Sequence, residues 1–381
     1  MEPTIHHGLA GVYFAESDIC HIDGERGELF YRGYDIRDLT EATYVEVVYL
    51  LWHGELPTAK QLEDFRAELV PHYPIPDKVM ELLLCLPPGT DPMHMLQAAA
   101  AMLAAFDQNP DEIDPDNLRR IGLSLVVQFP NLVATFERLR RGEAPLEPRS
   151  DLGLAGNFLW MLNGEVPNDA AIRVLNTALL LHAEHGSNAS TFTARTSAST
   201  LTDAYSAIAA AVGSLKGPLH GGANEAVMRT LEQIGSVEKI EQYVLDTLAK
   251  PRGRVMGFGH RVYRVLDPRG KILRDVAEKL AETSSEAKYF HMSLEMERVM
   301  EREMNARGKS NIRPNLDFFS ASVYRMLGIP VDMYTPVFAV ARVSGWMAHL
   351  YEQYAENHLV RPRLQYRGEL GKRFVPLAER G

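Results

Sequence analysis

The stretch Thr335-Pro-Val-Phe-Ala-Val-Ala-Arg-Val-Ser-Gly-Trp-Met-Ala-His-Leu-Tyr-Glu-Gln-Tyr354 predicts one long helix, and similar patterns place the chain in the mainly α class. Arg342 interrupts the apolar run from Pro336 to Val343. Because arginine is rarely buried without an anionic partner, Arg342 is expected to meet a carboxylate of the protein or of a ligand.

Helical patterns dominate most of the sequence. The further segments expected to be helical are 44–52, 93–106, 169–185, 197–215, 237–248, 271–282, 286–307 and 317–327. Glycines are expected to end two of them, Gly54 after the first and Gly186 after the third. Ser199, Thr200 or Thr202 could cap the fourth. Short apolar pieces between glycines in residues 8–34 predict a small β-element.

Two Gly-Pro regions suggest a division into domains. Lys216-Gly-Pro218 and Gly328-Ile-Pro330 are candidate hinges, although such pairs are more often ordinary turns. The hypothesis is a large helical domain made of residues 1–218 and 329–381, with a smaller helical domain, residues 219–328, inserted in it.

Composition excludes several classes of function. The 381 residues are 46% hydrophobic and 24% charged, which is typical of a globular protein with a sizeable core. A net charge of −10 argues against a nucleic-acid or anionic-membrane partner. The two cysteines, Cys20 and Cys85, favour reduced thiols over a disulfide framework. Without a signal-like N-terminus or an apolar run of about 18 residues, a cytoplasmic protein is expected.

Three segments of the second half each place one titratable group beside glycine or proline. They are Gly217-Pro-Leu-His-Gly-Gly-Ala-Asn-Glu225, Gly257-Phe-Gly-His-Arg-Val-Tyr263 and Arg313-Pro-Asn-Leu-Asp-Phe-Phe319. Their groups, His220, His260 and Asp317, could take a proton from carbon and hold the resulting oxyanion. The alternative for Asp317 is a purely structural role as a helix N-cap.

Basic residues gather near these groups. Residues 251–269 contain five arginines and one acid, which favours contact with anions: Arg252, Arg254, Arg261, Arg264 and Arg269. His185 is expected at a helix C-terminus, where the macrodipole favours its charged form. His182 and His185 are spaced i, i+3, but without further ligands nearby no metal site is predicted. The basic residues between Arg361 and Arg373 could instead belong to a solvent-exposed tail without a binding role.

Together the three segments resemble the citrate synthase family. The resemblance runs from Gly8-Leu-Ala-Gly11 and Tyr31-Arg-Gly-Tyr-Asp-Ile36 to Arg361-Pro-Arg363. It implies an almost entirely helical fold whose small domain closes over the ligands, and at least a homodimer. The implied reaction condenses acetyl-CoA with oxaloacetate and water to give citrate and coenzyme A, at the entry to the tricarboxylic acid cycle. Coenzyme A is then a cosubstrate, and no permanently bound cofactor is expected.

The resemblance also assigns roles. Asp317 would remove the methyl proton of acetyl-CoA, His220 would hydrogen-bond the thioester oxygen, and His260 would polarise the oxaloacetate carbonyl. The groups implied for the carboxylates are His185, Arg269, Arg342 and Arg361, the last coming from the neighbouring subunit. The implied coenzyme A contacts are Val255, Met256, Gly257, Phe258, Gly259, Arg264, Lys309 and Asn311.

Three positions depart from the family's common pattern. They are Met256, Arg313 and Ala321, all near the segments that carry the chemistry. The related 2-methylcitrate synthases use propionyl-CoA, and one methylene in a pocket changes binding by only about 1–3 kcal/mol. Propionyl-CoA therefore stays open as the alternative acyl substrate, and a non-catalytic binding protein with the same fold is the alternative from another class.

Overall fold

The computed structural model describes residues 4–9, 11–260 and 262–380. Arg261, one of the five arginines of residues 251–269, lies outside the described residues. The described chain is mainly α-helical, as predicted, with one small antiparallel sheet near its start.

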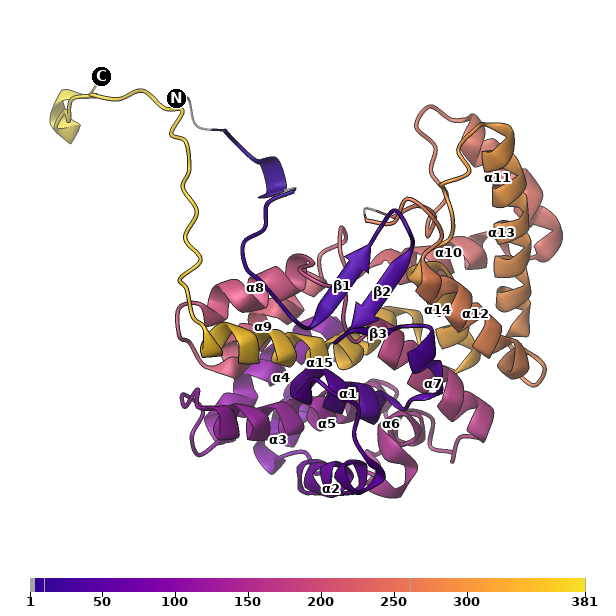
Figure 1. Ribbon diagram of the computed structural model, residues 1–381, viewed down its shortest axis with the longest axis horizontal. Helices are drawn as coiled ribbons and strands as arrows, with labels where there is room; N and C mark the ends of the chain where they lie inside the picture. Colours follow the sequence, from indigo (N-terminus) through magenta and orange to yellow (C-terminus); the bar gives the residue numbers. More distant parts are fainter. Residues whose placement is uncertain (1–3, 10, 261, 381) are drawn as a thin grey trace.

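The sheet confirms the predicted β-element. Its strands are β1 (Cys20–Asp23), β2 (Glu28–Tyr31) and β3 (Tyr34–Asp35), in the order β1-β2-β3. Cys20 pairs with Tyr31 and Asp23 with Glu28, so residues 24–27 form the tip of a hairpin. In Figure 1 this hairpin stands on the helical body and points toward the orange segments of the second half.

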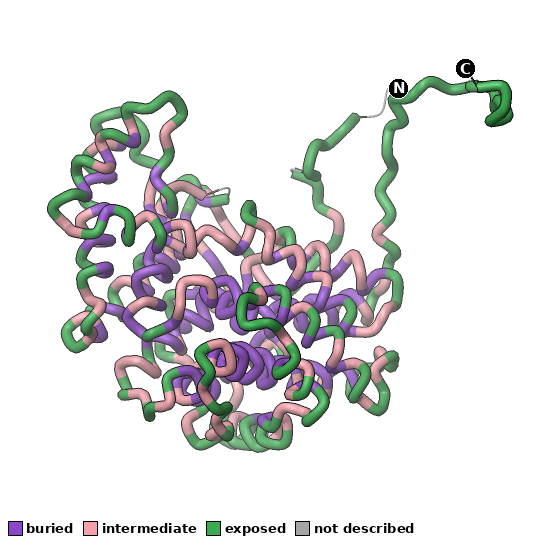
Figure 2. Tube along the Cα trace, turned by 180° about the vertical axis from the view of Figure 1, so that it is seen from behind, coloured by how far each residue is buried: buried purple, intermediate pink, exposed green. Residues whose placement is uncertain are grey.

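Ten helices build the body around the sheet. They are α1 (Tyr44–His53), α2 (Ala59–Leu69), α3 (Asp77–Cys85), α4 (Pro92–Leu103), α5 (Pro115–Arg140), α6 (Gly153–Asn163), α7 (Asp169–His182), α8 (Ala189–Ala198), α9 (Ala204–Leu215) and α15 (Tyr334–Ala355). The central helix is α15, which packs on α5, α7, α8 and α9 and is buried along most of its length. Figure 2 shows the buried chain concentrated in this middle layer.

Five helices form the other side of the molecule. They are α10 (Ala223–Ile234), α11 (Ile240–Ala249), α12 (Pro268–Ala281), α13 (Ala287–Ala306) and α14 (Leu316–Met326). Helices α11 and α13 pack together at the edge of the molecule, whereas α12 packs on both α14 and α7 (Figure 1). The predicted division at residues 218 and 329 places all five in the small domain, and that division stays a prediction.

Several predicted helix boundaries are confirmed. Helix α1 ends at Gly54, which adopts the left-handed conformation with φ 88° and donates its N–H to Leu50. Helix α15 extends the predicted segment 335–354 by one residue at each end. The prediction contained no helix at the positions of α2, α3, α5, α6 and α10, although α5 is the longest in the described residues.

The helix predicted over residues 197–215 is confirmed for residues 204–215, which form α9, but its predicted start was wrong. Two helices, α8 and α9, meet at a turn in which Leu201 has φ 63°. The cap of α9 is Asp203, whose carboxylate accepts the N–H of Ser206 at 2.8 Å, rather than Ser199, Thr200 or Thr202. A carboxylate at the first turn satisfies an amide that the helix cannot pair itself.

After α15 the chain leaves the body. Residues 361–380 are exposed throughout, and Figure 1 shows this segment running away from the helices in yellow. Large apolar side chains on it face solvent, among them Leu364, Leu370 and Phe374. Among the described residues no helix combines the length and apolar character needed to cross a bilayer.

Candidate active site

His220 lies in the loop before α10, against the start of α8. Its Nε2 accepts the backbone N–H of Ser190 at 3.3 Å and lies 2.8 Å from Ser190 Oγ. The N–H groups in the first turn of a helix lack partners within the helix, so this one is available to the imidazole. An Nε2 that accepts from an amide carries no proton, which places the proton of the ring on Nδ1.

The glycine after His220 allows this approach. A Cβ on Gly221 would lie 2.5 Å from the carbonyl oxygen of Leu215 and 2.8 Å from Thr335. Gly221 N–H also donates to that carbonyl at 2.9 Å. The loop is therefore pressed against α9 and α15, as a residue without a side chain permits.

His260 is held by its other ring nitrogen. Its Nδ1 accepts the backbone N–H groups of Val262 at 3.0 Å and Tyr263 at 3.2 Å. The proton of the ring is therefore on Nε2. Burial lowers the pKa of His260 to about 4, with a further contribution from the positive charge of Arg269. His260 is thus a neutral imidazole at physiological pH.

His185 lies beside His260, with ring centroids 5.4 Å apart, and its Nε2 is 3.3 Å from the hydroxyl of Tyr263. The prediction of a charged His185 at a helix end was wrong. Helix α7 ends at His182, with Ala183 as its C-cap, so Gly186 does not cap it either. Burial, then the charges of Arg269 and its neighbours, lower the pKa of His185 well below its usual value.

Asp317 is the second residue of α14. Its predicted alternative role as N-cap was wrong, because Asn315 caps the helix and accepts the N–H of Phe318 at 3.2 Å. The side chain of Asp317 keeps some solvent exposure, yet desolvation raises its pKa to about 6. The nearby charge of Arg269 limits this rise.

Backbone pairing joins the His260 loop to the start of α14. Gly259 N–H donates to the carbonyl of Arg313 at 2.8 Å, and Asn315 N–H donates to that of Gly257 at 3.0 Å. The Asn315 side chain also donates to the carbonyl of Gly259 at 3.1 Å. Segments separated by more than 50 residues thus hold His260 and Asp317 in one place.

Arg269 and Arg342 are both buried beside these groups. Arg269 donates two hydrogen bonds to Asp267, from Nε at 3.0 Å and from Nη2 at 2.8 Å. Burial alone would raise the pKa of Asp267, but this arginine holds it below its usual range. Arg342 donates from Nε to the carbonyl of His182 at 2.7 Å. The negative charge of the buried Glu184 carboxylate stabilises the positive charge of the Arg342 guanidinium group.

Arg361 lies elsewhere in this chain. It follows α15 in the exposed C-terminal segment, which leaves the body of the molecule (Figure 1). Sequence and fold within one chain therefore do not bring Arg361 to the other predicted carboxylate-binding residues.

Two of the residues predicted to contact coenzyme A, Arg264 and Asn311, line a groove of mixed charge. Its volume is about 510 Å³, and its lining also includes Lys271, Arg274 and Arg313 together with the acidic Glu297 and Glu301. Arg274 pairs with Glu297 and Arg313 with Glu301, so among the described residues Arg264 is the lining arginine that has no acidic partner inside the groove. The segment 255–259 lies next to it through the pairing with residues 313–315, with Val255 and Gly257 buried and Met256 exposed. Lys309 is exposed at the end of the turn after α13.

The three departures from the family pattern occupy different surroundings. Arg313 forms an ion pair with Glu301, and Met256 is 41% exposed. Ala321 is fully buried in α14, one turn beyond Asp317. Only Ala321 therefore belongs to the packed interior behind the carboxylate.

Three residues that hold or contact the predicted site residues were not predicted from the sequence. Ser190 orients His220, Tyr263 contacts His185, and Asp267 holds Arg269. The Asp267-Pro268 pair is a recognisable helix start, and Asp267 does cap α12. Nothing local could have identified Ser190, which lies 30 residues from its partner.

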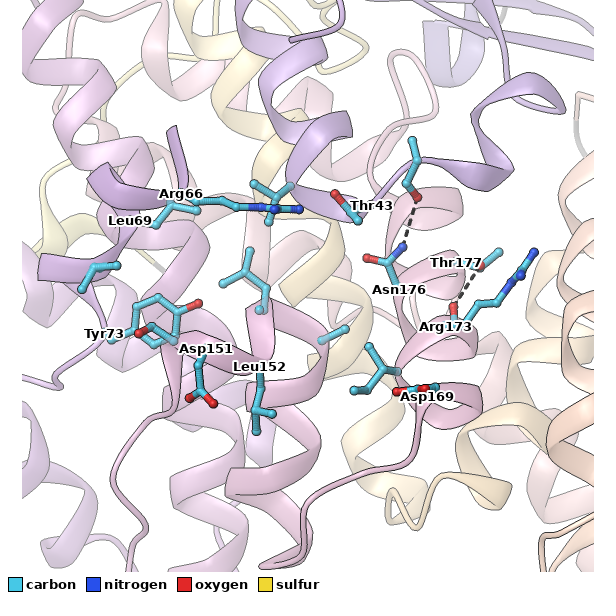
Figure 3. A pocket seen from close by; sticks show the side chains of 18 of the residues that line it. Thr43, Arg66, Leu69, Tyr73, Asp151, Leu152, Asp169, Arg173, Asn176 and Thr177 are labelled. Atoms are coloured by element: carbon cyan, nitrogen blue, oxygen red, sulfur yellow. Dashed lines mark hydrogen bonds between the residues drawn. The ribbon is translucent and has the colours of Figure 1, made fainter. Parts of the chain in front are cut away.

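A separate cavity of about 640 Å³ lies in the helical body, apart from the predicted site residues. Figure 3 shows it between α1, α2, α6 and α7, with Thr43, Tyr73, Asp151 and Arg173 among its side chains. None of the residues predicted for catalysis or substrate binding lines it. In the described parts of the chain, no three histidine, cysteine or acidic side chains gather in a way that could hold a metal ion.

Comparison with known proteins gives one consistent result. A family model described as "Citrate synthase, C-terminal domain" matches residues 8–363. Citrate synthase 2 of Bacillus subtilis (strain 168) is 45% identical, over 99% of this chain and 100% of its own. A 2-methylcitrate synthase 1 of Corynebacterium glutamicum is 41% identical, over 100% and 99% of the two chains.

Solved structures agree. The crystal structure of citrate synthase from Pyrobaculum aerophilum has a TM-score of 0.91 at 37% identity, covering 99% of this chain and 95% of its own. A citrate synthase from Thermoplasma acidophilum in ternary complex with carboxymethyl coenzyme A and oxaloacetate has a TM-score of 0.91 at 34% identity, covering 99% and 100%.

Proposed function

This chain belongs to the citrate synthase family, and we propose that it condenses acetyl-CoA with oxaloacetate and water, giving citrate and coenzyme A. One observation carries the proposal. A carboxylate whose pKa is raised to about 6, Asp317, is joined through backbone pairing to the loop of the neutral imidazole His260. A base and an oxyanion donor in one site suit proton removal beside a carbonyl.

Proton removal from the methyl group begins the reaction. Asp317 accepts the proton, because a carboxylate with pKa near 6 is ionised at neutral pH and yet more basic than an ordinary aspartate. His220 donates from Nδ1 to the thioester oxygen as charge develops there. A donor aimed at a forming oxyanion contributes about 3–4 kcal/mol to transition-state stabilisation.

Carbon–carbon bond formation follows. The enolate carbon attacks the keto carbon of oxaloacetate, and the keto oxygen takes the proton of His260 Nε2 to become the hydroxyl of the product. The proton that Asp317 took from the methyl group then returns to His260, so both groups regain their starting states. His185, Arg269 and Arg342 hold the carboxylates, and guanidinium groups suit this role because they bind carboxylates with two parallel hydrogen bonds. Water then cleaves the C–S bond of the citryl thioester, releasing citrate and the thiol of coenzyme A.

Coenzyme A would occupy the groove lined by Arg264 and Asn311. The backbone of Val255 to Gly259 would lie beside it, and the side chains Arg264, Lys309 and Asn311 would supply polar contacts. Arg264 offers positive charge to the phosphates of the cosubstrate, and the lining carries more basic than acidic side chains.

The working unit is proposed to be a homodimer of the cytoplasm, acting at the entry to the tricarboxylic acid cycle. The exposed C-terminal segment supports a dimer, since its apolar side chains and Arg361 face solvent in one chain. In the dimer, Arg361 would reach the oxaloacetate site of the partner. The small domain, residues 219–328, would close over the ligands and exclude water during condensation.

Replacing Arg361 tests the shared site. Arg361→Ala is expected to raise the KM for oxaloacetate about tenfold, because a carboxylate loses a charged hydrogen-bond donor. Arg367→Ala, on the same exposed segment, is the matched control and should leave the KM unchanged. Equal KM values for the two variants would make Arg361 an ordinary surface charge.

A thiol-release assay tests the reaction itself. Oxaloacetate is supplied with either acetyl-CoA or propionyl-CoA, and kcat/KM is compared. Acetyl-CoA is expected to be the better substrate, and a preference for propionyl-CoA would assign the protein as a 2-methylcitrate synthase. Oxaloacetate binding without thiol release from either thioester would instead indicate a binding protein.

A further inference from the structure

The β1–β2 hairpin touches both sides of the oxaloacetate site. At its base, the hydroxyl of Tyr31 donates to the carbonyl of Glu184 at 2.8 Å, directly before His185. At its tip, Gly24 accepts the backbone N–H of Arg264 at 2.8 Å. Figure 1 shows the hairpin reaching from the helical body to the loop between α11 and α12. A single element therefore contacts the His185 turn and the loop that follows His260.

The tip of the hairpin is a well-ordered turn. The carboxylate of Asp23 accepts the N–H groups of Glu25 at 3.0 Å and Arg26 at 2.9 Å. The backbone carbonyl of Asp23 also accepts the N–H of Gly27, at 2.9 Å. These bonds hold the backbone of the tip in one conformation, so its position can be passed to whatever packs on it.

Gly24 makes the closest approach. A Cβ built on it would lie 2.3 Å from the carbonyl oxygen of Val262, whereas carbon and oxygen normally stay about 3.3 Å apart. Its φ lies outside the left-handed region, so alanine is compatible with the backbone conformation itself. A side chain here would have to displace the loop by about 1 Å, and its cost would come from that displacement.

We propose that Gly24 is a positioning residue for the loop 262–266, and that its lack of a side chain sets how closely this loop approaches His185. The inference rests on the proposed function, which assigns Arg264 of this loop to coenzyme A and the neighbouring His185 to oxaloacetate. Tyr263 follows the crowded Val262, and its hydroxyl lies 3.3 Å from His185 Nε2. A shift of 1 Å would separate them, and misplacements of this size cost about 100-fold in rate.

Gly24→Ala tests the proposal, with Gly89→Ala as the matched control. Gly89 lies in the loop between α3 and α4, and a Cβ on it would meet nothing within 4 Å. Calorimetric titration with oxaloacetate alone measures the site without turnover, and thermal unfolding measures the fold. Gly24→Ala is expected to weaken oxaloacetate binding at least tenfold and to lower kcat/KM about 100-fold. Its unfolding midpoint should stay close to those of Gly89→Ala and wild type.

The outcomes separate this inference from the proposed function. Wild-type affinity in Gly24→Ala would overturn the role of Gly24 while leaving the function intact. Wild-type protein that binds no oxaloacetate and releases no thiol would overturn the function itself. A drop in affinity matched by a large drop in unfolding midpoint would mean a structural role only, and would also overturn the proposal.

Asp23→Ala keeps the test decisive if Gly24→Ala folds poorly, and a double variant identifies the contact that Gly24 makes. Asp23→Ala adds no atoms but removes the two hydrogen bonds that order the tip, and is expected to weaken oxaloacetate binding about threefold. Unchanged binding in this variant would contradict the proposal. Adding Val262→Ala to Gly24→Ala should restore nothing, because the closest contact is with a backbone oxygen. Full restoration would show that the side chain of Val262, rather than the loop backbone, is what Gly24 accommodates.

Discussion

At His220 the ring nitrogen that accepts a hydrogen bond from the backbone is Nε2, whereas at His260 it is Nδ1. In both cases the donor belongs to the main chain. His220 uses an amide of the first turn of α8, and His260 uses two amides of its own loop. Opposite ring nitrogens therefore carry the proton in the two imidazoles that we propose for the active site.

The difference shows how a backbone can select a tautomer. A main-chain N–H cannot turn away or change its protonation, so the ring nitrogen that faces it must act as the acceptor. The proton is then fixed on the other nitrogen, as a donor toward substrate would require. The proposed reaction stabilises two oxygens in succession, and the two imidazoles would supply one such donor for each.

Removing the base should have the largest effect. Asp317→Asn keeps the shape of the side chain but cannot accept a proton, so kcat is expected to fall about 10³-fold. Thiol release with acetyl-CoA and oxaloacetate measures it, with the exposed Asp246→Asn on α11 as the control. If the variant keeps more than a tenth of wild-type kcat, Asp317 is not the base that removes the methyl proton.

Amide substitutions test the contrast between the two imidazoles directly. The amide nitrogen of asparagine resembles Nδ1 in position, and that of glutamine resembles Nε2. His220→Asn should therefore retain about tenfold more activity than His220→Gln, and at position 260 the order should reverse. The poorer variant of each pair is expected to lose about 10²- to 10³-fold in kcat, the usual cost of an oxyanion donor. The same order at both positions would contradict the assigned tautomers.

The pH dependence should show the smallest effect and sharpen the same comparison. Asp317 must be ionised to accept a proton, so kcat/KM should be level above pH 7 and fall about tenfold per unit below its pKa of about 6. His260, with a pKa of about 4, stays neutral across this range and contributes no change. A pH–rate profile measures both statements. If kcat/KM of Asp317→Asn still falls below pH 6, the titration belongs to another group.

Part of this molecule could be predicted from local patterns. Helix α1 and its glycine stop, the long helix α15 and the small sheet follow from periodicity and turn residues. The turn at Leu201, between the end of α8 and the start of α9, was missed, because an alanine-rich run hides it. The charge state of His185 was wrong for a different reason. Its pKa depends on burial and on Arg269 and Arg342, which are distant in sequence.

The sequence by itself determined the helical class, the three segments with His220, His260 and Asp317, and the family, because these depend on local spacing and residue type. Only the tertiary structure decided which ring nitrogen of each histidine is the acceptor, why the pKa of Asp317 is raised, and how Gly24 meets Val262. Those properties arise from burial and from contacts between remote segments. Free energies of this kind depend on distance in space, which the order of residues along the chain does not contain.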